Sequence, residues 1–206
     1  EGRTMLGSEQ YNWLLNKIET SSAKWNMLGN SVMFSPMNLA TLQQDDKTKP
    51  VSSSLSSNIT GIPVNGDQWD GYSAERRLLI DALSKHDSHT LFVTGDIHSE
   101  WAHNISKDGR IFGAEMVCAS VSAPNVNEQL KLPEGNELSK LAERYLMGAN
   151  PHTRHVDLDH HGYSYVTVHP DSAEMHWLRV DNLLTAKSPV REAVTMTWRP
   201  GEGYSK

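Results

Sequence analysis

The sequence predicts a layered α/β or α+β protein. Two kinds of segment alternate along its 206 residues, namely stretches with apolar residues at helical spacing and short apolar or alternating runs typical of strands. A hydrophobic content of 37% and a charged content of 21% belong to an ordinary globular protein, and this length suffices for one full core. The formal net charge of −6, without a Lys/Arg block, argues against nucleic-acid binding.

The first third of the chain predicts one helix and one strand. Apolar residues at helical spacing predict a helix over residues 8–20, with Ser8 as its N-cap. Residues 24–34 are typical of a strand that is interrupted near Gly29. The following residues 38–66 include a Ser-rich stretch and few large apolar side chains, so we expect an exposed insertion or loop there.

The central part alternates helices with buried strands. Ser73 is a suitable cap for a helix over residues 73–83. A short buried strand precedes Gly95, a second is expected over residues 111–122, and a short helix over residues 136–147. These segments supply the core of the predicted sheet.

The last third predicts a hairpin followed by one more strand. Alternating residues 163–168 and the run 175–180 would pair across a turn at Pro170 and Asp171. A short strand is expected at residues 194–198, within a C-terminal extension formed by residues 181–206. No apolar run approaches the length of about 18 residues that a membrane span requires.

The most informative motif is Gly95-Asp96-Ile97-His98, directly after the buried strand that ends at Thr94. Sheet proteins place ligands and metals at such strand ends. Because Asp96 and His98 are two residues apart, they could share a face or converge in a tight turn on one ion or on two adjacent ions. The same tetrapeptide is equally compatible with a solvated turn, so the neighbouring residues must decide.

Other polar residues are first assigned ordinary structural roles. We expect Asp67 and Asp70 to be turn or cap residues rather than ligands, and His103 to lie on the surface rather than in the site. Cys118 is expected to be a buried, inert thiol. Five histidines in polar contexts are expected to be solvated: His86, His89, His152, His155 and His169.

Several blocks of the sequence, in the same order, resemble the PhoD-like alkaline phosphatases of the calcineurin-like metallophosphoesterase superfamily. The blocks are Arg3-Thr4-Met5-Leu6-Gly7-Ser8-Glu9-Gln10, Ser22-Ala23-Lys24-Trp25, Asp67-Gln68-Trp69-Asp70-Gly71-Tyr72, Thr94-Gly95-Asp96-Ile97-His98-Ser99, and Asn150-Pro151-His152 with His161-Gly162-Tyr163. The resemblance covers residues 1–180 and implies the C-terminal part of a metallophosphatase domain. It implies a layered β-sandwich flanked by helices.

The resemblance also implies a metal site and an activity. The superfamily's last metal motif is Gly-His-x-His, and the PhoD-like branch has a carboxylate in place of the first histidine. Asp96 would therefore bind one metal and His98 another, in a cluster of Ca²⁺ with Fe³⁺ that serves hydrolysis of phosphate mono- and diesters. The substrate would be a small phosphate ester, and the family resemblance implies a secreted or periplasmic location.

The family's remaining ligands belong to motifs that precede this part of the domain. Since the sequence contains none of these motifs and starts without an initiator Met, we expect a chain in which the N-terminal half of the domain is absent. This half would supply mainly one sheet, and would need either the other half or self-association to cover its apolar face.

Residues of the matching blocks are candidates to contact substrate or to support the metal ligands: Trp69, Asp70, Tyr72, His161 and Tyr163. No other catalytic residue is assigned. Two alternatives to the enzyme remain open at this point. The chain could be a non-catalytic fragment that acts as a folding or interaction module, or, since it has six tryptophans, a carbohydrate- or surface-binding β domain.

Overall fold

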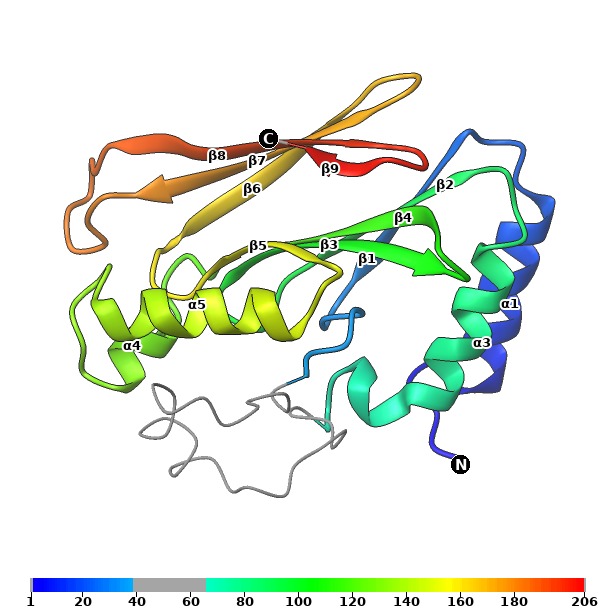
Figure 1. Ribbon diagram of the computed structural model, residues 1–206, viewed down its shortest axis with the longest axis horizontal. Helices are drawn as coiled ribbons and strands as arrows, with labels where there is room; N and C mark the ends of the chain where they lie inside the picture. The colour runs from blue at the N-terminus through cyan, green and yellow to red at the C-terminus, as the bar shows by residue number, and fades with distance from the viewer. Residues whose placement is uncertain (1, 39–65, 206) are drawn as a thin grey trace.

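A computed structural model describes residues 2–38 and 66–205 of the chain. The insertion expected at residues 38–66 lies outside the described residues, except for its two end positions. The described residues form three layers, namely a four-stranded sheet, a five-stranded sheet and a layer of helices (Figure 1). This arrangement confirms the predicted fold class, a mixed α/β sandwich of sheets flanked by helices.

The five-stranded sheet has the order β1-β2-β4-β3-β5. Its strands are β1 (Trp25–Asn30), β2 (His89–Thr94), β3 (Glu100–Lys107), β4 (Arg110–Val117) and β5 (Thr153–Asp157). β1, β2 and β4 are parallel, whereas β3 is antiparallel to both β4 and β5. The ends of β1, β2, β4 and β5 and the start of β3 therefore lie at one edge of the sheet, which we call the carboxyl edge.

Two details of this sheet differ from the prediction. β1 pairs with β2 without interruption through Gly29 and ends at Asn30, so the expected break near Gly29 and the extension to Phe34 are wrong. β3 and β5 were not predicted. The first six residues of β3 are buried although they include Glu100, His103 and Asn104, a polar composition that conceals a core strand.

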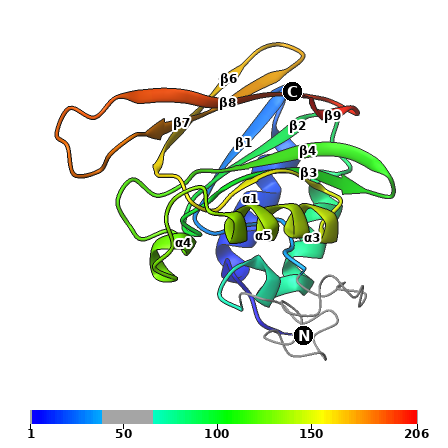
Figure 2. The same cartoon turned by 60° about the vertical axis from the view of Figure 1, so that its left-hand side comes forward.

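The helices cover the face of this sheet that is turned away from the second sheet (Figure 2). They are α1 (Gly7–Thr20), the 3-10 turn η1 (Trp69–Tyr72), α3 (Ser73–Leu83), α4 (Val126–Gln129) and α5 (Glu137–Ala149). The three predicted helices are confirmed as α1, α3 and α5, but the N-cap of α1 is Leu6 rather than Ser8. Apolar side chains of α1 and α3 pack on Phe92 and Phe112 of the sheet.

The second sheet is antiparallel, with the order β6-β7-β8-β9. Its strands are β6 (Gly162–Val168), β7 (Ala173–Val180), β8 (Val190–Arg199) and β9 (Gly203–Ser205). The predicted hairpin is confirmed as β6 and β7. β8 and β9 come from residues 181–206, so this part of the chain belongs to the same sheet.

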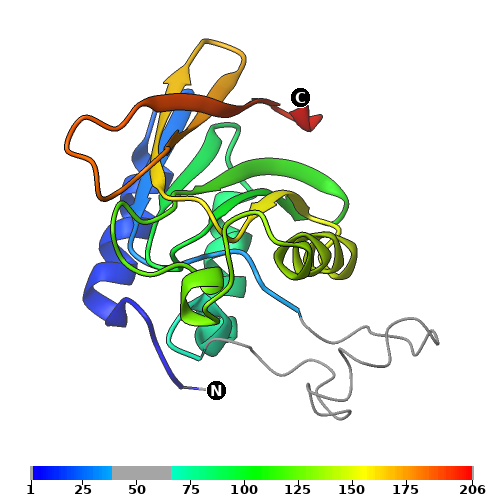
Figure 3. The ribbon, with the colours of Figure 1, turned by 90° about the vertical axis from the view of Figure 1, so that its left-hand side faces the viewer.

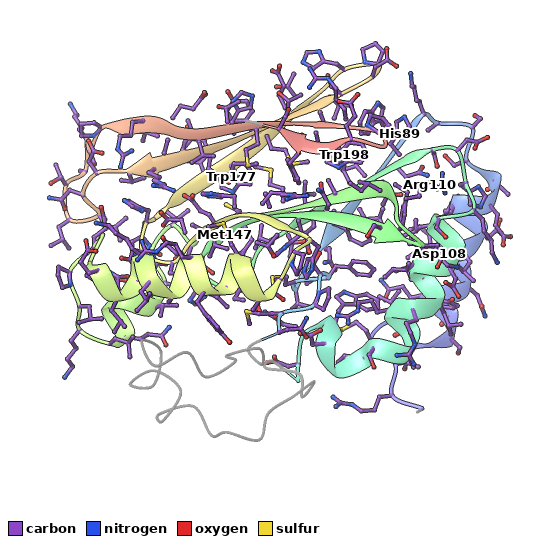
Figure 4. The ribbon with its side chains drawn as sticks, viewed as in Figure 1. His89, Asp108, Arg110, Met147, Trp177 and Trp198 are labelled. Atoms are coloured by element: carbon purple, nitrogen blue, oxygen red, sulfur yellow. The ribbon has the colours of Figure 1, made fainter. Side chains whose placement is uncertain are left out.

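The two sheets stack face to face, as the end-on view shows (Figure 3). Trp177 and Trp198 fill the space between them and are fully buried (Figure 4). They pack with Leu91 and Met116 of the five-stranded sheet in one apolar cluster. The chain thus contributes both sheets, and the expectation that it would supply mainly one sheet is wrong.

A buried ion-pair network joins the two sheets at the carboxyl edge. Arg179, near the end of β7, donates to Glu100 from Nε to Oε1 at 3.0 Å and from Nη2 to Oε2 at 2.7 Å. The same Nη2 lies 2.9 Å from Oδ2 of Asp157. Only 1% of the Glu100 side chain and 11% of the Arg179 side chain are exposed, so neither charge is solvated by water. The network fixes β7 against β3 and β5.

Replacing Arg179 with Ala should lower the free energy of unfolding by about 3–5 kcal/mol, because two buried carboxylates lose the guanidinium that they share. Arg191→Ala, which removes the exposed pair with Asp181 from the neighbouring strand, is the matched control and should cost less than about 1 kcal/mol. Urea unfolding of both variants measures the difference. Equal losses would show that the buried network does not stabilise the sandwich.

The network also predicts a pH dependence of stability. Burial alone would lower the pKa of His160, but its hydrogen bond and attraction to Asp157 prevail, and the pKa is raised. A raised pKa in the folded state stabilises the protein fully below the unfolded value of about 6.5, and this contribution is lost as the pH rises through the folded pKa. We therefore expect His160→Gln to destabilise the chain more at pH 5.5 than at pH 9.

Urea unfolding at both pH values measures this difference for His160→Gln. The exposed His169 provides a matched variant, His169→Gln, whose effect should be small at both pH values. A loss for His160→Gln that is the same at pH 5.5 and pH 9 would contradict the expectation.

Candidate metal site

The predicted metal motif lies in the five-residue connection 95–99 between β2 and β3, at the carboxyl edge. β4 is located between these two strands, so the connection passes across the end of β4. Backbone N–H of Cys118, just beyond β4, donates to the Thr94 carbonyl at 2.9 Å below this crossing. Asp96 and His98 are therefore held over the sheet edge where ligands of α/β proteins bind.

The backbone of this connection has two non-glycine residues with positive φ, Asp96 at 73° and His98 at 55°. The N–H of Ile97 donates to the Gly95 carbonyl at 3.0 Å and closes a three-residue turn centred on Asp96. Such conformations cost of the order of 1–3 kcal/mol for each residue and concentrate at functional sites. The extended arrangement considered from the sequence is thus replaced by a tight turn.

The two side chains each have one defined partner. Asp96 is exposed, and its Oδ2 accepts a long hydrogen bond from Nε2 of the buried Gln68 at 3.4 Å. His98 is partly buried, and its Nδ1 lies 3.1 Å from the carbonyl oxygen of Pro124. A carbonyl oxygen can only accept, so the hydrogen-bonding pattern assigns the proton to Nδ1 and leaves the lone pair on Nε2.

His161 supports the loop that supplies the Pro124 carbonyl. It is buried at the start of β6, and its Nε2 lies 3.0 Å from Oε2 of Glu128. The same carboxylate oxygen accepts the backbone N–H of Asn125 at 3.0 Å. This N–H is the main reason why the pKa of Glu128 is lowered, and His161 contributes in the same direction.

The block from Asp67 to Tyr72 is anchored mainly by packing and hydrogen bonds. Trp69 is buried, stacks edge-on against Phe34 at 5.2 Å between ring centroids, and donates from Nε1 to Asn30 Oδ1 at 3.1 Å. Tyr72 is partly buried, and the Arg3 guanidinium lies 4.5 Å from its ring centroid. Trp69 thereby contacts the carboxyl end of β1.

Both oxygens of Asp70 are engaged. Oδ1 lies 2.6 Å from Nη1 of Arg76, and Oδ2 accepts the N–H of Met37 at 3.0 Å. Asp70 lies in the η1 turn, as expected, but its side chain forms a buried ion pair between η1 and α3 and caps neither element. Tyr163 is exposed on β6, and because its neighbour Ser164 pairs with the core residue Trp177, it faces the outer side of the four-stranded sheet.

Three histidine assignments made from the sequence need correction. His103 was expected on the surface but is fully buried, and burial lowers its pKa well below the usual value. His152 and His155 were expected to be solvated, but each has a defined partner: Nε2 of His152 is 2.9 Å from the Pro36 carbonyl, and Nε2 of His155 is 3.0 Å from Oε2 of the buried Glu100. Burial raises the pKa of the Cys118 thiol, as expected for an inert cysteine.

Sequence reasoning did not single out Gln68 and Glu128, which contact Asp96 directly and His98 through a peptide group. Gln68 was visible only as part of a matching block, and Glu128 only as a possible cap of a short helix. Across residues 2–38 and 66–205, no three His, Cys, Asp or Glu side chains are grouped so that they could hold a metal ion. Asp96 and His98 thus stand without a third candidate ligand among the residues that the structure describes.

Comparison with known proteins identifies the family. Residues 1–177 match the family model described as PhoD-like phosphatase. The chain belongs to the PhoD-like phosphatase family. Alkaline phosphatase D of Bacillus subtilis (strain 168) is 33% identical to this PhoD-like chain over 175 residues, which cover 82% of the chain and 25% of that protein.

A solved structure described as "Structure of PhoD" has the same fold, with a TM-score of 0.74 and 24% identity. It is covered to 35% by this chain, while the whole of this chain is matched. The PhoD-like chain thus spans about a quarter of the curated relative and a third of the solved one. Among its described helices, none has the length and apolar character to cross a membrane.

The surroundings of Trp69 and Tyr72 predict different effects of two conservative substitutions. Trp69→Phe should lower the free energy of unfolding by about 1–3 kcal/mol, since it removes a hydrogen bond and leaves a void in the core. Tyr72→Phe should change it by less than about 0.5 kcal/mol, because no described residue hydrogen-bonds the Tyr72 hydroxyl. Urea unfolding measures both.

In an active enzyme that contains this segment, the kinetic constants of the same two variants separate packing from substrate contact. A changed KM or kcat at unchanged melting temperature would assign Trp69 or Tyr72 to the substrate site. A lowered melting temperature alone would leave the residue a packing role.

Proposed function

We propose that this chain supplies part of the metal site of a phosphatase that hydrolyses phosphate mono- and diesters. The observation that carries the proposal is the geometry of residues 95–99, where one tight turn and two residues with positive φ hold a carboxylate and an imidazole over the carboxyl edge. Membership of the PhoD-like phosphatase family supports the reaction class. Small phosphate esters are the proposed substrates, and a secreted or periplasmic location is proposed from the family.

The side chains present fit a metal ion. His98 has its Nδ1 committed to the Pro124 carbonyl, so its Nε2 offers a lone pair, which is the common arrangement of metal-bound histidines. Asp96 is exposed and has a carboxylate oxygen available beside Gln68. Imidazole suits a transition metal such as iron, whereas carboxylate oxygen suits Ca²⁺ as well, so we propose a site for Ca²⁺ with Fe³⁺.

When bound, such metals polarise phosphoryl oxygens and activate water. The residues of this chain would hold the metals in place and orient the side chains that bind them. Asp96 would bind from the centre of the turn and His98 from the residue just after it, and Gln68 would orient the Asp96 carboxylate. Trp69, Asp70 and Tyr72 would support the turn from the η1 side, His161 from the β6 side. Because Asp96 and His98 are only two ligands, further ligands must come from residues outside those described here.

This proposal is tested by placing the chain in a complete enzyme. Residues 1–177 would replace the matching segment of alkaline phosphatase D of Bacillus subtilis, and hydrolysis of p-nitrophenyl phosphate and bis-p-nitrophenyl phosphate would be measured. We expect His98→Ala and Asp96→Ala each to lower kcat/KM by more than about 100-fold, because loss of a metal ligand should exceed the 10- to 100-fold effect of its supporting partners. Bound metal should fall in parallel.

Two variants serve as matched controls. Asp108 is also an exposed aspartate with positive φ, but it lies in the β3–β4 turn at the opposite edge of the sheet (Figure 4). His169 is an exposed histidine in the β6–β7 turn. Asp108→Ala and His169→Ala should leave both metal content and turnover unchanged, which would separate loss of a ligand from a general effect of charge or folding.

The 206-residue chain alone should be essentially inactive even with added Ca²⁺ and iron, since its described residues provide an incomplete site. Metal-dependent turnover by the chain alone that survives His98→Ala would place the site elsewhere. A grafted enzyme that keeps its activity in both ligand variants would favour the alternative of a non-catalytic folding or interaction module.

A further inference from the structure

The peptide group between Pro124 and Asn125 connects the His98 imidazole with an acidic side chain. Its carbonyl oxygen lies 3.1 Å from His98 Nδ1, and its N–H donates to Glu128 Oε2 at 3.0 Å. A trans peptide is planar, with its C=O and N–H pointing in opposite directions, and no described peptide bond is cis. The Glu128 carboxylate and the imidazole therefore lie at opposite edges of one rigid, planar peptide group.

Buried groups hold the Asn125 edge of this peptide group. Glu128 Oε2 is also 3.0 Å from Nε2 of His161, of which 6% is exposed. Asn125 is fully buried and donates from Nδ2 to the Asp159 carbonyl at 2.8 Å. Asp159 and His161 belong to the connection between β5 and β6, so the Pro124–Asn125 peptide is fixed to the body of the sandwich rather than to a free loop.

The consequence concerns the choice of tautomer. A neutral imidazole carries its proton on one of two nitrogens, and the hydrogen bond made by one nitrogen decides whether the other can bind a metal. Among the residues that the structure describes, the Pro124 carbonyl is the one hydrogen-bond partner of His98. If the Pro124–Asn125 peptide rotated, the Pro124 carbonyl would move away from His98, and either ring nitrogen of His98 could carry the proton.

We propose that Glu128 is a positioning residue, which holds the Pro124–Asn125 peptide so that His98 keeps its proton on Nδ1 and presents Nε2 for a metal. This inference rests on the proposed role of His98 as a ligand, but the state of the imidazole is a property of the chain itself. A carboxylate thus acts on the metal ligand across a backbone peptide, where supporting carboxylates commonly contact the histidine directly.

A purely structural role of Glu128 predicts something different. Glu128 is the third residue of α4, and its bond to the Asn125 N–H is one half of a capping box. If it only capped this short helix, its removal would loosen α4 and leave the His98 tautomer as it was. The tautomer is therefore the observable that distinguishes the two roles.

The test is a long-range ¹H–¹⁵N correlation spectrum of the metal-free 206-residue chain with ¹⁵N-labelled histidine, at a pH where His98 is neutral. The His98 signals are assigned by their loss in His98→Ala. We expect His98 to be in the Nδ1–H form in the unsubstituted chain. In Glu128→Ala it should shift to a mixture in which at least about half is Nε2–H, since the Pro124–Asn125 peptide loses one of the contacts that hold its carbonyl in place.

Two variants make this result specific. Glu128→Gln keeps an oxygen that can accept the Asn125 N–H, so it should retain the Nδ1–H form. Glu137→Ala removes an equally acidic side chain from the first turn of α5, where its partner is Lys140 at 3.0 Å, and should have no effect. An unchanged His98 tautomer in Glu128→Ala would overturn the proposal, as would a shift of equal size in Glu128→Gln.

If Glu128→Ala does not fold, His161→Phe removes the outer support of the carboxylate and leaves the cap intact. It should shift the tautomer in the same direction by a smaller fraction, and no shift would overturn the proposal. The fate of the proposed function is read separately, from His98→Ala in the grafted enzyme. Retained metal dependence there would refute the ligand role while leaving the tautomer result valid.

Discussion

The bidentate contact between Arg179 and Glu100 is the interaction on which the arrangement of the two sheets depends most directly. Apolar packing drives the sheets together but is not directional, so it alone would allow one sheet to slide over the other. The planar guanidinium donates two parallel hydrogen bonds to a carboxylate, which requires one relative orientation of the two groups. The same guanidinium also pairs with Asp157. This contact therefore helps to set the register between the sheets, and it lies at the carboxyl edge, as the predicted metal motif does.

The sequence was sufficient to predict the three long helices but not α4, η1 or all of the strands. α1, α3 and α5 have a clear helical spacing of apolar residues, a local signal that needs no knowledge of distant contacts. β3 carries Glu100 and His103, which look solvated until their partners are known, and Arg179 is 79 residues away from Glu100. Sequence periodicity cannot detect a strand whose polar side chains are buried by pairing with remote elements.

The candidate site was partly predictable for a similar reason. Asp96 and His98 could be selected as candidates because the residue types and the spacing of a metal motif are local features of the sequence. The contact of His98 with Pro124 involves a backbone carbonyl, which every residue possesses, so the identity of residue 124 gives no hint of it. Gln68 and Glu128 come from distant segments, and only the fold brings Gln68 to Asp96 and Glu128 to the peptide group that contacts His98.

Residues 95–99 cross the end of β4, so the spacing of the strands fixes the distance that this segment must span. Neighbouring strands are about 4.8 Å apart, so the connection must bridge about 10 Å between β2 and β3. An extended chain of this length would overshoot, and the turn at Asp96 takes up the excess. Adding or deleting one residue would change the turn and displace the two side chains unequally. Insertions here are consequently constrained by strand spacing.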